Sequence, residues 1–146
     1  VKLKHSINKT LIRNKSLILV DDSLVRGTTS IKIIQMLYDC GAKEVHVRIA
    51  SPPIKYPDYY GVDTPSKKEL LASKYDLDGM RKFINATTLQ FLSIEGLYKS
   101  MGFEHRNPTY PQFTDHCFSG EYPVIPIDAN EKELDNDQLS FLSSKF

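Results

Sequence analysis

The hydrophobic and polar positions in the first third of the chain follow the pattern strand, loop, helix, strand. Residues 17–20 form a continuous apolar run, typical of a strand buried on both faces of a parallel sheet. Apolar residues then recur at three- and four-residue spacing over 29–40, which predicts an amphipathic helix closed by Gly41. Residues 45–50 alternate like a second strand. A βαβ unit of this kind has parallel strands and a right-handed crossover, so the predicted fold class is α/β, a parallel sheet flanked by helices.

The pattern continues with shorter elements up to Gly102. Residues 66–73 and 77–85 are predicted to be short helices, opened by Ser66 and Asp76 respectively. Residues 89–92 are predicted to be a last strand. A helix over 94–101 follows, capped by Ser93 and closed by Gly102. Aliphatic residues then become sparse, so we expect the compact domain to span residues 1–102 and an irregular C-terminal extension to span 103–146. Its aromatic part is expected to pack on the domain, and its acidic end to be mobile or weakly helical.

The segment LILVDDSLVRGTTS carries the most chemical information. It places two carboxylates, Asp21 and Asp22, where a buried strand ends, and a glycine followed by hydroxyl side chains where a helix begins. Ligands of open α/β sheets bind at that edge, and a helix start offers unpaired N–H groups to a phosphate. A simpler interpretation is that Gly27 only turns the chain and that Thr28 or Thr29 only caps the helix.

The adjacent acids favour a ligand. Two carboxylates beside a phosphate site suit a molecule with vicinal hydroxyls or a bound divalent cation. Because neighbours on a strand point to opposite faces, one of the pair could instead be structural and bind the loop's own amides. The sequence leaves open which of the two this is.

A family resemblance rests on these residues. The motif VDDSLVRGTT, residues 20–29, resembles the signature with which type I phosphoribosyltransferases bind phosphoribosyl pyrophosphate (PRPP). The resemblance to the amidophosphoribosyltransferase branch covers residues 1–123 and rests on the segments VKLKHS, GAKEVHVRIASPPI, YGVDTP, ELLAS, FLSIEGLYKSMG and QFTDHCFSGEYP. It implies that residues 1–102 are the C-terminal part of a phosphoribosyltransferase domain.

The resemblance also implies a reaction and a set of site residues. Members of the family convert PRPP and glutamine to 5-phosphoribosylamine, glutamate and pyrophosphate, the first step of de novo purine biosynthesis. Asp21 and Asp22 would contact the ribose hydroxyls and Mg²⁺, and Lys4 would lie near the pyrophosphate, although a solvated lysine of an edge strand is the simpler interpretation of Lys4. The loop that surrounds the 5′-phosphate would comprise Ser23, Arg26, Gly27, Thr28 and Thr29.

Some members of the family hold an iron–sulfur cluster through four cysteines. Three of the matching positions are Asp58, Thr114 and Cys117, and only the last can supply a thiolate, so we expect no cluster here. Cys40 and Cys117 are interpreted as packed small hydrophobes. The four histidines are scattered, and none is assigned a catalytic role.

Composition excludes some classes of partner. Nineteen Lys and Arg balance eighteen Asp and Glu, a formal charge of +1, which offers no basic surface for nucleic acid. No apolar run is long enough to cross a membrane, and the cysteines suggest no disulfide framework, so a cytoplasmic location is expected. The chain begins with Val1 inside an alternating segment, and we expect a piece of a longer, homo-oligomeric enzyme whose glutaminase domain lies upstream.

Three alternatives remain at this point. A phosphorelay receiver domain also has paired acids after a strand, but it needs a phosphoacceptor aspartate after a later strand, and VHVRIASPP supplies none. A PRPP-sensing regulator without catalysis would carry a DNA-binding domain or a basic face. An inactive fragment would keep the motif without the activity.

Overall fold

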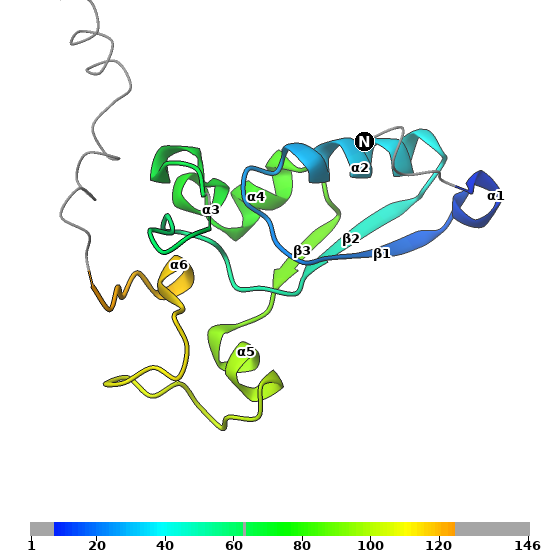
Figure 1. The fold of residues 1–146 in the computed structure, drawn as a ribbon. Helices are drawn as coiled ribbons and strands as arrows, with labels where there is room; N and C mark the ends of the chain where they lie inside the picture. Colours follow the sequence, from blue (N-terminus) through cyan, green and yellow to red (C-terminus); the bar gives the residue numbers. More distant parts are fainter. Residues whose placement is uncertain (1–7, 63, 125–146) are drawn as a thin grey trace, which may run out of the picture.

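The chain folds around a three-stranded parallel sheet, in the order β1-β2-β3, in a computed structural model that describes residues 8–62 and 64–124 (Figure 1). The strands are β1 Ser16–Asp21, β2 Glu44–Ile49 and β3 Thr88–Phe91. In the register, Leu17 pairs with Val45, and Val47 pairs with Leu89. The predicted α/β class and both strands of the βαβ unit are confirmed. The segment VKLKH lies outside the described residues.

Helices cover one face of the sheet. The two larger ones are α2 Thr28–Asp39, which connects β1 to β2, and α4 Leu77–Phe83, which precedes β3 (Figure 1). Their apolar sides pack against the inward side chains of all three strands, as the helical spacing in the sequence predicts. The buried hydrophobic core comprises Leu24, Ile34, Leu37, Val45, Val47, Ile49, Leu71, Ala72, Met80, Ile84, Ala86 and Leu89.

The opposite face of β1 is open, and here the prediction of a strand buried on both faces is wrong for the described residues. The side chains of Ile18 and Val20 are 69% and 67% exposed. Strand β1 lies at the edge of the described sheet, and its alternate residues Leu17 and Leu19 pack against the core. An apolar run thus fits a strand with one covered face as well as a strand with two.

The short helices differ in part from their predictions. The expected helix over 66–73 divides into the 3-10 turn η1 Lys67–Glu69 and α3 Leu71–Lys74, because Leu70 between them is extended and fully buried. The N–H of Leu71 then donates to the carbonyl of Val25 at 2.8 Å. Two further helical turns, α1 Lys9–Ile12 and α6 His116–Ser119, were not predicted.

Two helix starts were predicted correctly. Asp76 caps α4 through its carboxylate, which accepts a bond from the N–H of Gly79 at 2.7 Å. Ser93 caps α5 Ile94–Ser100 in the same way, through the N–H of Gly96 at 2.9 Å. Each cap satisfies an amide that the helix itself leaves unpaired.

The described part of the C-terminal extension packs on the loop after β2. The carbonyl of Cys117 in α6 accepts bonds from the N–H groups of Lys55 and Tyr56 at 3.0 and 3.2 Å. The hydroxyl of Tyr122 donates to the carbonyl of Pro57 at 2.7 Å. These bonds confirm that the aromatic stretch packs on the domain. The acidic end lies outside the described residues, and the domain boundary at residue 102 stays a prediction.

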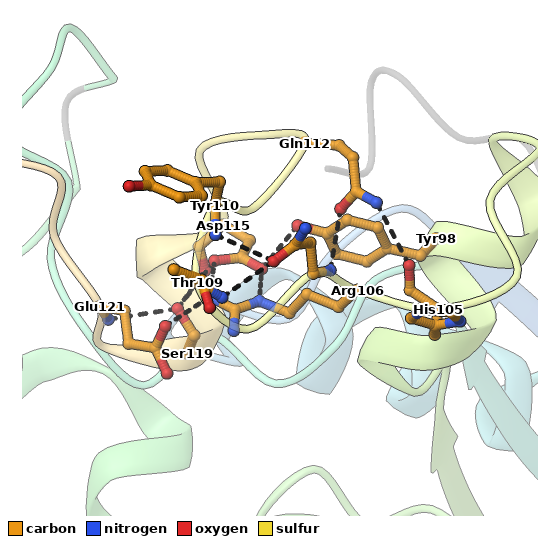
Figure 2. A network of polar contacts seen from close by, with 10 residues as sticks. Tyr98, His105, Arg106, Thr109, Tyr110, Gln112, Asp115, Ser119 and Glu121 are labelled. Carbon is orange, nitrogen blue, oxygen red and sulfur yellow. Dashed lines mark hydrogen bonds and ion pairs between the residues drawn. The ribbon is translucent and has the colours of Figure 1, made fainter.

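Arg106 organises the extension (Figure 2). Its guanidinium contacts the buried carboxylate of Asp115 at 2.5 and 3.1 Å and the carboxylate of Glu121 at 2.7 Å. Tyr98 of α5 donates its hydroxyl to Asp115 at 2.9 Å. Burial alone would raise the pKa of Asp115, but the hydrogen bonds from Arg106 and its neighbours outweigh burial and hold that pKa below its ordinary value. The network joins α5 to the start of α6, because Tyr98 and Arg106 both bond the carboxylate of Asp115.

Candidate functional site

The predicted site residues other than Lys4 lie in the loop between β1 and α2, at the last residue of β1 and at the first two residues of α2. The loop leaves the sheet at the edge where the carboxyl ends of the parallel strands lie, which is where α/β proteins bind ligands. Leu24 is buried and anchors the loop in the core, and the carbonyl of Val25 accepts the bond from Leu71. The loop is therefore held by α3 as well as by the βαβ unit. Lys4 lies outside the described residues.

Gly27 caps α2 in the left-handed conformation, with φ 76°, and no side chain forms a cap hydrogen bond. The carbonyl of Gly27 accepts the first helical bond, from Ile31, at 2.9 Å. Thr28 and Thr29 are the first two helical residues, and both are exposed. The interpretation that one of these threonines caps the helix is therefore wrong. Within residues 8–62 and 64–124, their hydroxyls and the first N–H groups of this twelve-residue helix have no hydrogen-bond partner, so they are available to a ligand.

The alternative role of Gly27, turning the chain, also has support. A Cβ at this position would lie 3.2 Å from Leu71 Cδ2, 3.2 Å from Phe83 Cε1 and 3.3 Å from Ile84 Cγ2. A positive φ and a close approach to the core both favour glycine here. The same backbone conformation of Gly27 turns the chain and leaves the helix start exposed. The two interpretations of Gly27 therefore do not exclude each other.

Asp21 and Asp22 follow each other at the end of β1. Oδ1 of Asp21 accepts the N–H of Asp22 at 3.1 Å, and Oδ1 of Asp22 accepts the N–H of Ser23 at 2.8 Å. Asp21 is half-buried and Asp22 is exposed. Each carboxylate thus bonds one amide of the loop, so the geometry does not single out one of them as structural. Among the described residues, Oδ2 of each makes no hydrogen bond, which leaves an oxygen for a hydroxyl or a cation.

Arg26 has a partner that the sequence did not indicate. Its Nε lies 2.9 Å from Oε2 of Glu69 in η1, and Glu69 also accepts a bond from the hydroxyl of Ser66 at 3.3 Å. The two charged side chains are far apart in sequence, and no motif joins them. Glu69 orients the guanidinium beside the start of α2.

A second group of polar side chains lies outside this loop and joins Asp58 to α6. Asp58 and His116 are 6% and 4% exposed, and Nε2 of His116 is hydrogen-bonded to Oδ1 of Asp58. Cys117 completes the group. Each of the three side chains has one atom that could bind a metal, and these three atoms lie within 4.8 Å of one another. Thr114, the remaining position that the resemblance links to iron–sulfur ligands, is exposed and outside the group.

Charge and burial shape this second group. Burial, followed by the charge of Asp58, raises the pKa of Cys117 to about 11. Burial alone would raise the pKa of Asp58, but bonds from the N–H of Val62 and from His116 outweigh burial and lower it. The sequence assigned no role to His116. Its position beside Cys117, in the segment TDHC, was the only local signal.

The fold and the loop define a class. An open parallel sheet flanked by helices is the α/β arrangement of phosphoribosyltransferases, and in this chain paired acids and a glycine-capped helix start lie at its carboxyl edge. No family model matches the chain. Comparison with solved structures finds the glutamine PRPP amidotransferase of B. subtilis, complexed with ADP and GMP. It superposes with a TM-score of 0.71 at 45% identity, over 80% of this chain and 26% of that one.

The sequence relatives bear one name. The amidophosphoribosyltransferase of Rhizobium etli is 55% identical over 145 residues, 99% of this chain and 29% of that protein. That of Bacillus subtilis is 46% identical over 124 residues, 85% of this chain and 26% of that protein. The chain is therefore a relative of one segment of the amidophosphoribosyltransferases, and it spans less than a third of their length. The resemblance stated from the sequence is confirmed.

Among the described residues, no helix is both long and apolar enough to cross a membrane.

Proposed function

We propose that this chain supplies the PRPP-binding segment of an amidophosphoribosyltransferase. The complete enzyme would convert PRPP and glutamine to 5-phosphoribosylamine, glutamate and pyrophosphate. The observation that carries the proposal is the start of α2, which Gly27 caps without a side chain, beside the carboxylates of Asp21 and Asp22. A phosphate at the helix start and a ribose at the carboxylates would then belong to one ligand.

The 5′-phosphate would bind at the first turn of α2. Backbone N–H groups and the exposed hydroxyls of Thr28 and Thr29 can donate to its oxygens, and the positive end of the helix dipole favours its charge. Arg26, which Glu69 orients, adds a positive charge at the rim. Ser23 and Lys4 complete the proposed set, with Lys4 toward the pyrophosphate.

The ribose and Mg²⁺ would bind at Asp21 and Asp22. Each carboxylate uses Oδ1 for a loop amide and has Oδ2 to offer, and carboxylate oxygens are the ligands that Mg²⁺ takes from proteins. The donor set therefore fits the ion. When bound, Mg²⁺ would neutralise charge on the pyrophosphate.

The reaction itself is a displacement at C1 of the ribose. The lone pair of ammonia forms the new C1–N bond while the C1–O bond breaks. The electron pair of the broken C1–O bond leaves with pyrophosphate. The nitrogen then loses a proton. Positive charge develops on the ribose, and the carboxylates of Asp21 and Asp22 would stabilise it. Holding the 5′-phosphate at α2 fixes the ribose for attack, so positioning and electrostatics carry the catalysis.

The partners of this segment are also proposals. Ammonia would come from a glutaminase segment elsewhere in the protein, and the complete enzyme would be a homo-oligomer. A cytoplasmic location remains a prediction, since several relatives are named as chloroplastic.

The first test is Asp22→Asn in the complete protein. Loss of a charge that contacts hydroxyls or Mg²⁺ should weaken Mg-PRPP binding about 10- to 100-fold, the effect of a charge-assisted hydrogen bond. Calorimetry measures the affinity, and pyrophosphate release measures turnover. Asp39→Asn at the other end of α2 is the matched control and should change neither. Equal behaviour of the two variants would remove Asp22 from the site.

The second test separates an enzyme from a PRPP-binding regulator. Thr29→Val removes one neutral donor and should weaken PRPP binding about fivefold, while Thr10→Val in α1 should not. In the parent protein, PRPP binding without pyrophosphate release, with either glutamine or ammonia present, would favour the regulator.

The third test uses the 146-residue chain alone. Because it spans less than a third of its relatives, it should bind PRPP weakly and release no pyrophosphate with glutamine. Turnover with ammonia close to that of a complete enzyme would show a self-sufficient transferase and contradict the proposal that the chain is one segment.

A further inference from the structure

The group formed by Asp58, His116 and Cys117 has the composition of a metal site. We propose that these three side chains bind one zinc ion, with water as the fourth ligand. The ring nitrogen, the carboxylate oxygen and the sulfur already lie within 4.8 Å of one another. Zinc ligands at about 2.0–2.3 Å from the ion are roughly 3.3–3.8 Å apart in a tetrahedron, so the most distant atoms need to close by about 1.5 Å at most. Nε2 of His116 and Oδ1 of Asp58, which are hydrogen-bonded, need to separate if both bind the ion.

The donor set favours zinc over other divalent ions. Thiolate, imidazole and carboxylate together are typical zinc ligands, whereas Mg²⁺ and Ca²⁺ take oxygen alone. An iron–sulfur cluster is held mainly by thiolates, and this group has only one, so a single ion fits better than a cluster.

The histidine gives a second, independent observation. Nδ1 of His116 is buried and has no hydrogen-bond partner among the described residues, although the residue is only 4% exposed. Buried polar atoms of native proteins are nearly always paired. Nε2 alone is bonded, to Asp58, so the ring keeps an unpaired nitrogen, and it must turn for Nδ1 and the carboxylate to reach the same ion. A simple buried Asp–His pair leaves that atom unexplained.

The ligands come from two segments that are already ordered. Oδ2 of Asp58 accepts a bond from the N–H of Val62 at 2.6 Å. The backbone N–H of Asp58 donates to the hydroxyl of Thr64 at 2.5 Å. The rings of Tyr60 and Tyr122 lie 4.8 and 5.1 Å from the ring of His116. The carboxylate is therefore oriented before the metal arrives, and aromatic rings limit solvent around it.

The position of the ligands assigns the ion a structural task. Asp58 belongs to the loop after β2, and His116 and Cys117 belong to α6. An ion bound by all three would join these segments across the same contact that the carbonyl of Cys117 makes with Lys55 and Tyr56. Zinc would thus fasten the C-terminal extension to the domain. This role is independent of the proposed PRPP site.

Cobalt(II) titration tests the site, because cobalt occupies zinc sites and reports a thiolate ligand by a charge-transfer band. Protein stripped with a chelator should bind one cobalt ion per chain, develop that band and lose it when zinc is added. Cys117→Ser should abolish the band and weaken metal binding by at least about tenfold. Cys40→Ser is the matched control, since Cys40 lies at the end of α2, and it should keep the band.

A thermal measurement covers the case in which a variant fails to fold. Zinc should raise the melting temperature of the parent protein and of Cys40→Ser, because it binds only the folded state, and should leave Asp58→Asn unchanged. Circular dichroism checks that each variant is folded. Metal uptake that is absent in the parent, or equal in the parent and Cys117→Ser, would overturn the proposal. Stoichiometric iron with acid-labile sulfide in anaerobically purified protein would overturn it as well.

Discussion

Arg26 and Glu69 form an ion pair of 2.9 Å between the loop after β1 and η1. Their side chains are 52% and 50% exposed, so the pair contributes at most about 1 kcal/mol to stability. Its consequence is local. It orients the guanidinium of Arg26, which precedes the start of α2, and it places a negative charge close to where a phosphate would bind.

Glu69→Gln should therefore change binding more than stability. Removing the carboxylate leaves Arg26 free to pair with the phosphate and should raise PRPP affinity about two- to fivefold at low salt. Calorimetry at two salt concentrations measures this, and Glu104→Gln in the extension is the control. Weaker binding by Glu69→Gln would mean that orientation of Arg26 matters more than repulsion.

Gly27→Ala should destabilise the fold. The left-handed φ of 76° costs an alanine about 1 kcal/mol, and its Cβ would press on Leu71, Phe83 and Ile84. Gly102→Ala separates the two effects, since Gly102 has φ 90° but nothing within 4 Å of a Cβ. Urea unfolding should show a larger loss for Gly27→Ala, by about 1 kcal/mol or more. Equal losses would mean that the core accommodates the added methyl group with no further loss in the free energy of unfolding.

Asp115→Asn should be costly because it leaves the half-buried Arg106 without its buried charged partner. We expect a loss of about 2–4 kcal/mol in the free energy of unfolding, as for other broken buried pairs. Asp78→Asn, which breaks an exposed ion pair with Arg81 and Lys82 in α4, should cost less than about 1 kcal/mol. Similar losses in the two variants would show that burial does not strengthen the Arg106 network.

The same pair has a defined pH dependence. The folded pKa of Asp115 lies below its unfolded value of about 3.9, so its stabilising contribution is present above that value and is lost as the pH falls through the folded pKa. The difference in stability between the parent and Asp115→Asn should therefore be largest near neutral pH and shrink below about pH 4. A difference that grows toward acid would contradict this.

The open face of β1 should promote self-association of the 146-residue chain. Ile18 and Val20 expose two adjacent apolar side chains on an edge strand. Replacing both by threonine keeps the strand preference and should lower the apparent mass in sedimentation experiments. Leu11→Gln removes an apolar side chain that is 70% exposed but lies in α1, and it should have no comparable effect.

The local elements could be predicted from the sequence because their causes are local. Helical spacing over 29–40, the capping residues Asp76 and Ser93, and the short apolar run of β1 each act within a few residues. The motif VDDSLVRGTT placed the paired acids at the strand end for the same reason. Leu70 shows the limit, because its burial under long-range packing divides a segment whose pattern favours one helix.

The sequence by itself determined the α/β class, the βαβ unit and the position of the candidate PRPP loop. Only the tertiary structure decided that β1 has one open face, that Glu69 pairs with Arg26, and that Asp58 meets His116 and Cys117. These relationships join residues 43 to 59 positions apart, or depend on which strand lies at the edge of the described sheet. A linear pattern records what neighbours along the chain prefer, whereas such contacts are set by how whole elements pack in space.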